Sequence, residues 1–222
     1  SSGMKQVLVG LQPQNLEDVI ALISLYRPGP MDSIPTYLRN RHEPDKISYK
    51  TPQLAHILDV TNGCIVYQEQ VMQIFRELAG FSFGQADNVR RAMSKKKHAV
   101  MEAEREHFVH GCTEPGHECP GCVANGISEK VANEIYDEMS SFASYAFNKS
   151  HAACYAYVAF QTAYLKCHYP SEFMAALLTS VLDNTDKVIR ANAPAWASRC
   201  FRRTSISRTA ASRRTTARFV SA

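Results

Sequence analysis

Apolar side chains recur at intervals of three and four residues through most of the chain before residue 183, which is the spacing that lines one face of an α-helix. Asn15 precedes one such run and carries a side chain that commonly caps a helix N-terminus. Gly80 follows another run and can take the left-handed conformation that ends a helix. We predict helices at 15–26, 33–41, 52–58, 68–78, 98–109, 128–145, 152–164 and 171–182, with a short helix around 88–93.

These patterns predict a mostly α fold, a multi-helix domain with at most one or two short strands. Residues 64–67 form an apolar, partly β-branched run after a glycine, so we expect an extended segment there. Residues 152–164 are dominated by Ala, Tyr, Val and Phe and carry little charge, so we expect an interior helix. No internal repeat at a solenoid period is evident.

The net charge of the chain is misleading when it is taken as a whole. The 222 residues carry +4, but eight arginines and no acidic residue or lysine lie from residue 190 onward, which leaves −4 for residues 1–189. A binding site for an anion must therefore be built by local clusters of cations and not by a global field.

One such cluster lies on the short helix around 88–93. Arg90 and Arg91 are adjacent near one face, and their guanidiniums can fork onto phosphate oxygens. Asp87 lies three and four positions before them and is expected to be their salt-bridge partner. A solvated basic turn is the alternative interpretation. Three lysines suited to a nucleic-acid backbone follow the helix: Lys95, Lys96 and Lys97.

A second cluster precedes the apolar helix at 152–164. Lys149 and His151 flank a predicted helix N-terminus, where backbone N–H groups favour an anion, whereas Ser150 can be explained simply as the helix cap. Tyr155 follows His151 by one helical turn. Its ring could stack on a base or fill the core.

Two further segments add candidate ligand groups. Arg27 opens an Arg-Pro-Gly-Pro corner that fixes its direction, which suits a phosphate clamp but equally a structural corner. Gln68 and Gln70 lie at the junction between the extended segment and the helix at 68–78, where polar groups can meet a ligand.

The seven cysteines are odd in number and mostly scattered, so we expect reduced thiols, no disulfides and a cytoplasmic protein. No apolar run approaches the length of a membrane span. One loop holds ligand types that suit tetrahedral zinc, but their spacing matches no standard zinc motif, so we expect no metal there. The four residues of that loop are Cys112, His117, Cys119 and Cys122.

Several long motifs, in the same order and at the same spacing, closely resemble one family. They are YRPGPM at 26–31, VYQEQVMQI at 66–74, LAGFSFGQADNVRRAMSKKK at 78–97, FNKSHAACYAYVAFQTAYLKCHYP at 147–170 and EFMAALLTS at 172–180. The family is the C family of replicative DNA polymerases, the alpha subunits of bacterial DNA polymerase III. The resemblance covers about residues 1–188.

The resemblance implies roles for the candidate residues in binding an incoming dNTP. Arg90 and Arg91 resemble arginines of the fingers that grip the triphosphate. Lys149, Ser150, His151 and Tyr155 resemble the wall beside the nascent base pair, and Arg27, Gln68 and Gln70 the lining of the same cleft. The family's Mg²⁺-binding aspartates lie in palm motifs that no residue here matches, so no catalytic residue is expected in this chain.

The resemblance also implies a division of the chain. Residues 1–30 correspond to the end of the palm, since the chain is expected to begin within a domain, and residues 31–188 correspond to the fingers. Residues 189–222 lose all periodicity and are expected to be a disordered basic tail, the product of a frameshift or otherwise non-native.

The function expected from this resemblance is the fingers portion of a DNA-directed DNA polymerase, inactive without its palm. The expected partners are primer–template DNA, dNTP and, in the intact enzyme, other replisome subunits that include the sliding clamp. Two alternatives stay open: a non-catalytic helical module that binds nucleic acid, and an interaction domain stabilised by zinc.

Overall fold

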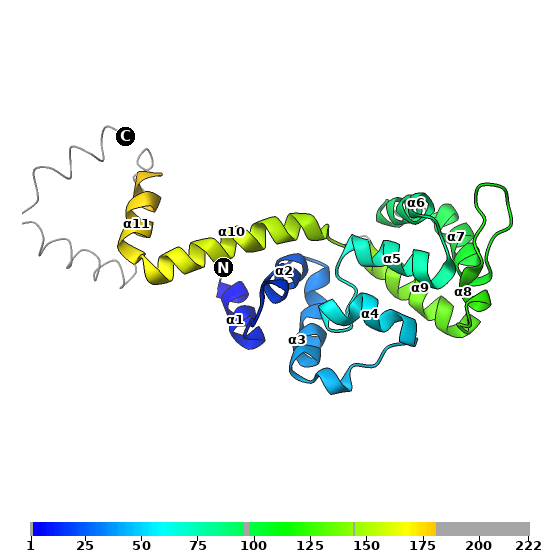
Figure 1. Ribbon diagram of the computed structural model, residues 1–222, viewed down its shortest axis with the longest axis horizontal. Coiled ribbons are helices and arrows are strands. Elements are labelled where there is room, and N and C mark those ends of the chain that lie inside the picture. Colours follow the sequence, from blue (N-terminus) through cyan, green and yellow to red (C-terminus); the bar gives the residue numbers. More distant parts are fainter. Residues whose placement is uncertain (1, 96–97, 144, 181–222) are drawn as a thin grey trace, which may run out of the picture. The chain divides into compact units, whose positions relative to one another are not determined.

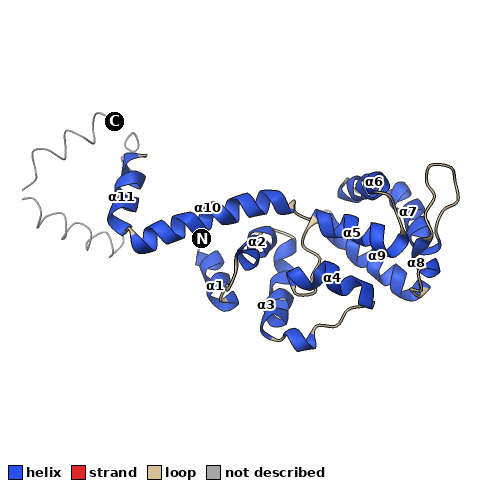
Figure 2. Ribbon diagram, viewed as in Figure 1, coloured by secondary structure: helices blue, strands red, loops and turns tan. Residues whose placement is uncertain are grey.

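The computed structural model of the chain describes residues 2–95, 98–143 and 145–180. Within these residues it has eleven α-helices, four short 3₁₀ helices and no strand (Figure 1, Figure 2). The prediction of a mostly α fold is therefore confirmed. The chain divides into two compact units, Ser1–Val158 and Ala159–Ala222. The predicted tail at 189–222 lies outside the described residues, and the predicted boundaries at 30 and 188 stay predictions.

The N-terminal part of the first unit contains α1 (Ser2–Leu11), α2 (Leu16–Leu25) and α3 (Ile34–His42). Helix α2 begins where the sequence predicts, because the Asn15 side chain accepts a hydrogen bond from the Asp18 backbone N–H at 3.0 Å. Apolar side chains from the three helices share one core with residues after Gly63 and with the start of α10 (Lys149–His168). Its buried members include Leu11, Ile20, Leu22, Leu25, Ile34, Tyr37, Val66, Tyr67, Ala152 and Ala156.

Short helical segments connect this core to the rest of the unit. They are η1 (Pro30–Ser33), η2 (Pro44–Lys46), η3 (Pro52–Leu54), α4 (Ala55–Leu58) and η4 (Asp59–Thr61). Residues 64–67 form no strand within the described chain and make only an isolated parallel bridge, between Tyr67 and Phe147. Phe147 N–H donates to the Val66 carbonyl at 3.2 Å, and Gln68 N–H donates to the Phe147 carbonyl at 3.0 Å. This bridge fixes the start of α10 beside the start of α5 (Gln68–Ala79).

Five helices enclose a second core: α5, α6 (Phe83–Ser94), α7 (His98–His110), α8 (Gly121–Ala124) and α9 (Glu129–Ala143) (Figure 1). Phe75 lies at its centre, with ring centroids 5.0 Å from Phe108, 5.3 Å from Phe81 and 6.0 Å from Tyr136. Gly80 ends α5 at φ 75°, as predicted. Ser82 begins α6 with a reciprocal pair of bonds to Gln85.

The helix expected at 152–164 exists within α10, but the prediction that it is an interior helix is wrong. Of its side chains before Ala159, only Ala152 and Ala156 are buried, while Tyr155 and Tyr157 are 58% and 56% exposed. Apolar side chains lie on every side of this helix, but before Ala159 only its alanine side packs against the core of the first unit. The second unit adds α11 (Pro170–Thr179). None of the described helices is both long and apolar enough to cross a lipid bilayer.

Candidate functional site

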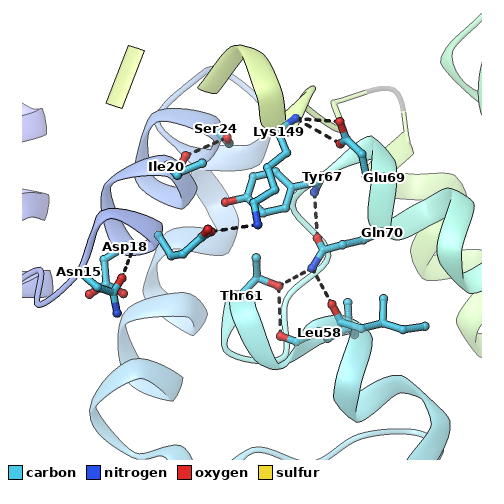
Figure 3. Close-up of polar contacts among 12 residues, drawn as sticks. Asn15, Asp18, Ile20, Ser24, Leu58, Thr61, Tyr67, Glu69, Gln70 and Lys149 are labelled. Carbon is cyan, nitrogen blue, oxygen red and sulfur yellow. Dashed lines mark hydrogen bonds and ion pairs between the residues drawn. The ribbon is translucent and has the colours of Figure 1, made fainter. Parts of the chain in front are cut away.

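The junction that leads into α5 is held by Gln70, whose side chain is 4% exposed. Its Oε1 accepts hydrogen bonds from the backbone N–H groups of Val66 and Tyr67, both at 2.9 Å. Its Nε2 donates to the Ile57 carbonyl at 3.1 Å and to Thr61 Oγ1 at 2.7 Å (Figure 3). Both ends of the amide are thus engaged inside the protein. Gln70 therefore supports the junction from within and presents no group to a ligand.

Gln68, at the first position of α5, connects two other segments. Its Nε2 donates to the Ala146 carbonyl at 3.0 Å, and its Oε1 accepts from Arg90 Nη1 at 3.0 Å. The Arg90 side chain is only 17% exposed. This guanidinium is consequently oriented by contacts from outside its own helix.

Asp87 binds both arginines of α6. Its Oδ1 accepts from Arg90 Nε at 3.0 Å and Nη2 at 2.7 Å, and its Oδ2 accepts from Arg91 Nη2 at 2.8 Å. The hydrogen bonds from Arg90, followed by the charges of Arg90 and Arg91, lower the pKa of Asp87. The salt-bridge role expected for Asp87 is confirmed.

The two arginines face different hollows. A pocket of about 480 Å³ lies between α5, α6 and the residue before α10, and Arg90 lines it. Arg91, whose side chain is 64% exposed, lines a separate hollow of about 250 Å³ with Asn88 and Lys95. Lys96 and Lys97 lie outside the described residues. Charged and amide side chains on the larger pocket are Gln68, Glu69, Gln73, Arg76, Glu77, Asp87, Arg90 and Asn148.

The N-terminus of α10 already holds a carboxylate. Glu69 accepts from the Lys149 backbone N–H at 3.1 and 3.2 Å (Figure 3). It also accepts from Asn148 Nδ2 at 3.2 Å. Asn148 caps the helix by accepting from the His151 backbone N–H at 2.9 Å, so the alternative interpretation of Ser150 as the helix cap is wrong. Glu69 thus takes the place at which the sequence suggested a ligand anion.

The Lys149 side chain is also engaged. Its Nζ forms an ion pair with Glu17 of α2 at 3.1 Å and lies 5.3 Å from the centroid of the Tyr67 ring. Burial, followed by the nearby Glu17 charge, raises the pKa of Tyr67. Lys149 therefore ties α10 to α2 through contacts between residues far apart in the sequence.

The Arg27 side chain likewise connects segments that are far apart in the sequence. Its Nη2 donates to the Tyr145 carbonyl at 2.6 Å and its Nε to the Ser24 carbonyl at 3.0 Å. The guanidinium carbon lies 4.3 Å from the centroid of the Phe147 ring. Burial lowers the pKa of Arg27. These contacts correspond to the structural-corner interpretation.

Beyond Phe147 a short aromatic stack leads along α10 into solvent. The rings of Phe147 and His151 are 5.3 Å apart, and those of His151 and Tyr155 are 4.7 Å apart. His151 and Tyr155 are exposed, as is Ser150, so Tyr155 does not fill the core. Neighbouring rings are tilted at interplanar angles of 61° and 58°, so the exposed rings of His151 and Tyr155 offer separate faces and edges to another π system.

The cysteine loop does not bring its four candidate ligands together. Cys122 is fully buried in the core, and burial raises its pKa to about 12. Cys119 Sγ lies 3.6 Å from the His107 carbonyl, whereas His117 is exposed. Across the described part of the chain, no three His, Cys, Asp or Glu side chains are grouped to share a metal ion. The zinc-stabilised alternative gains no support.

Sequence reasoning missed the importance of Glu17 and Glu69. Each pairs with a residue or backbone group of the α10 N-terminus from more than seventy residues away, and no local spacing signals such a contact. Asp87, in contrast, was detectable because it is one helical turn from both of its partners.

Comparisons with known proteins identify the family of this chain. Residues 1–116 match the model of the family described as the bacterial DNA polymerase III alpha subunit finger domain. The chain is 49% identical over 193 residues to DNA polymerase III subunit alpha of Thermus aquaticus. This match covers 85% of this chain and 15% of that protein. The corresponding protein of Bacillus subtilis is 47% identical over 188 residues, or 85% of this chain and 16% of that protein.

A third relative is DNA polymerase III subunit alpha of Staphylococcus epidermidis, at 45% identity over 187 residues, 84% of this chain and 17% of that protein. The chain thus spans about a sixth of the length of these relatives. The family model matches more than half of the 222 residues. The chain therefore belongs to the bacterial DNA polymerase III alpha subunit finger domain family.

Proposed function

We propose that this chain is the fingers portion of a replicative DNA-directed DNA polymerase and that Arg90 binds the triphosphate of the incoming dNTP. The observation that carries the proposal is the position of Arg90 in a fingers-family chain: its guanidinium lines the pocket between α5 and α6 and is held by Gln68 and Asp87. Nucleotidyl transfer depends chiefly on positioning and on neutralising phosphate charge, and a fixed guanidinium supplies both.

The hydrogen bonds of Arg90 leave it able to bind phosphate. A guanidinium has five N–H donors, and the contacts with Asp87 and Gln68 engage Nε and one hydrogen each on Nη1 and Nη2. The two remaining N–H groups can donate to phosphate oxygens in a forked arrangement. Asp87 is shared by two arginines, so these three side chains keep a net charge of +1.

The other predicted residues would act around this cation. His151 and Tyr155 would supply the aromatic surface beside the nascent base pair. Lys149 would have to leave Glu17 before it could reach a phosphate, so it would contribute less than Arg90. Lys95 with Arg91 would face the nucleic-acid backbone from the smaller hollow.

The described residues do not fit a Mg²⁺ site, since they hold no cluster of three candidate ligands. We propose that Mg²⁺ in the intact polymerase is bound by residues outside this chain and that the chain alone extends no primer. Primer–template DNA and dNTP would be its ligands, and replisome subunits including the sliding clamp would be partners of the intact cytoplasmic enzyme.

The test is an Arg90→Ala substitution in a complete polymerase, made by exchanging this segment into the Bacillus subtilis relative. Losing a charge-assisted hydrogen bond should raise KM for dNTP roughly ten- to a hundredfold. Arg76→Ala is the matched control, because Arg76 lines the same pocket but contacts the Phe83 ring. It should change KM for dNTP far less.

The same variants separate the polymerase from a simple nucleic-acid-binding module. If Arg90→Ala weakens duplex binding in a salt-dependent way but leaves KM for dNTP unchanged, the triphosphate role is wrong and the module is favoured. The purified chain should give no primer extension, and any extension in a preparation free of other polymerases would contradict the need for a palm.

A further inference from the structure

The loop between α7 and α8 places two cysteines directly opposite each other in a hydrogen-bonded antiparallel pair. Cys112 N–H donates to the Cys119 carbonyl and Cys119 N–H donates to the Cys112 carbonyl, both at 2.9 Å. Such a hydrogen-bonded antiparallel pair has its Cα atoms about 5.5 Å apart, and both side chains lie on the same side of the ladder. A Cα separation of that size is within the range of disulfides.

Two glycines hold the base of this loop closed. A Cβ on Gly111 would lie 2.5 Å from the Pro120 carbonyl oxygen, and a Cβ on Gly121 would lie 2.3 Å from the Gly111 nitrogen. Both residues have positive φ, of 87° and 78°. The backbones on the two sides of the loop can therefore approach only because these positions lack side chains. The facing of the two cysteines is thus built into the backbone.

The two cysteines differ in how far they are exposed to solvent. Cys112 is partly exposed, whereas Cys119 is 7% exposed and burial raises its pKa. The third cysteine of the loop, Cys122, is fully buried in the core around Phe75, so its thiol is not exposed to an oxidant in solution. An oxidant from solution would therefore meet Cys112 first, with Cys119 behind it as the nearest thiol across the ladder.

We propose that Cys112 and Cys119 form a reversible disulfide that closes the loop at 113–118 when the protein meets a low-molecular-weight disulfide. The Cys112 thiolate attacks one sulfur of that disulfide and expels one thiolate. Cys119, after losing its proton to solvent, then attacks Cys112 Sγ and expels the second. The protein loses two protons and two electrons, and the small disulfide gains them and becomes two thiols.

The bond should be reducible and not permanent. Directly opposed residues of a ladder have Cβ atoms about 4.5–5.5 Å apart, which is longer than the roughly 3.8 Å of an unstrained disulfide. Closing the bond must draw the two sides of the loop together, and strained disulfides are the ones that thiols reduce readily. The pair would respond to the thiol balance of its surroundings.

The experiment treats the folded, purified chain with oxidised glutathione, blocks the remaining thiols under acid quench and digests it with a protease that cleaves after glutamate. Glu118 lies between the two cysteines and is not followed by proline, so cleavage after it separates them unless a disulfide joins their peptides. We expect a joined Cys112–Cys119 peptide pair, a chain lighter by two hydrogens, and loss of both signals after dithiothreitol.

Two variants sharpen this result. Cys154→Ser removes an exposed thiol on α10 and should leave the joined pair intact. Cys112→Ser is conservative at a partly exposed site and should abolish the joined pair and leave Cys119 without a glutathione adduct. An unmodified pair in the parent chain or a stable glutathione adduct on Cys112 would each overturn the proposal. So would a joined pair in which fragmentation places the disulfide on Cys122 and not on Cys119, which lies in the same peptide.

Discussion

The core around Phe75 and the first half of α10 use apolar side chains in opposite ways. Phe75, Phe108 and Tyr136 are almost completely buried, and their rings meet edge to face or tilted. Tyr155 and Tyr157 of α10 are more than half exposed, although their segment is as apolar as the core helices. Apolar composition alone therefore does not decide burial.

The arrangement of the apolar residues accounts for the difference. In α5, Val71, Ile74, Phe75 and Leu78 form one stripe, and polar residues fill the remaining positions, so one face is directed inward. Residues 152–158 contain no polar residue that would define an outer face. Of these residues, only the small side chains of Ala152, Ala153 and Ala156 meet the N-terminal core. A stripe predicts burial, whereas uniform apolarity predicts only that contact surface exists.

The largest loss of stability is expected from a substitution at the centre of the core around Phe75. Phe75→Ala should lower the free energy of unfolding by about 3–5 kcal/mol, because it removes a fully buried ring that contacts three other aromatic rings. Urea denaturation followed by circular dichroism measures this. Phe75→Leu keeps more of the volume and should lose less. Equal losses for the two variants would show that the cavity is not the cause.

The next effect concerns the polar junction between the two cores. Gln70→Ala should lower the free energy of unfolding by roughly 2–4 kcal/mol, because four buried groups lose their hydrogen-bond partner. Gln73→Ala is the matched control, since Gln73 lies on the same helix and bonds only to Glu77 at the surface. If Gln73→Ala destabilises as much, the loss reflects α5 in general and not the buried amide.

The helix ends and the Phe75 core could be predicted from the sequence because their causes are local. Asn15 and Gly80 act within one helical turn, and the α5 stripe repeats at the helical period. The start of α6 at Ser82 lies earlier than the helix predicted around 88–93. The ties around the candidate site could not be predicted. Lys149 pairs with Glu17, and Arg27 with the Tyr145 carbonyl, across more than a hundred residues of sequence. Their geometry depends on how the two cores meet, which no local pattern encodes.

Alkaline pH should lower the stability of the core around Phe75 through its buried thiol, Cys122. The pKa of Cys122 is raised by burial to about 12, whereas the unfolded thiol has its ordinary pKa near 9, so the folded state holds its proton more tightly. Stability from this group is complete below about pH 9 and falls by about 1.4 kcal/mol per pH unit as the pH rises toward 12. Urea denaturation at intervals from pH 8 to pH 11 measures the slope.

A substitution and a labelling experiment test whether the Cys122 thiol causes this pH dependence. Cys122→Ala should reduce the slope without abolishing it, because burial also raises the pKa of Tyr136. A thiol reagent at pH 8 should label the exposed Cys154 of α10 and leave Cys122 unreacted. Rapid labelling of Cys122 in the native chain, or a slope that Cys122→Ala does not change, would contradict a closed core at this position.

The smallest effect is expected on α10. Tyr157→Ala should change the free energy of unfolding by less than about 0.5 kcal/mol, because the ring is 56% exposed and no buried group depends on it. Ala156→Leu is the matched contrast one residue earlier: Ala156 is fully buried against the N-terminal core, and a larger side chain there should be destabilising by about 1–3 kcal/mol. Urea denaturation of both variants measures the two values. If Tyr157→Ala proved the more destabilising of the two, this part of α10 would behave as a buried helix. Apolar composition alone would then predict burial as well as an apolar stripe does, contrary to the comparison with α5.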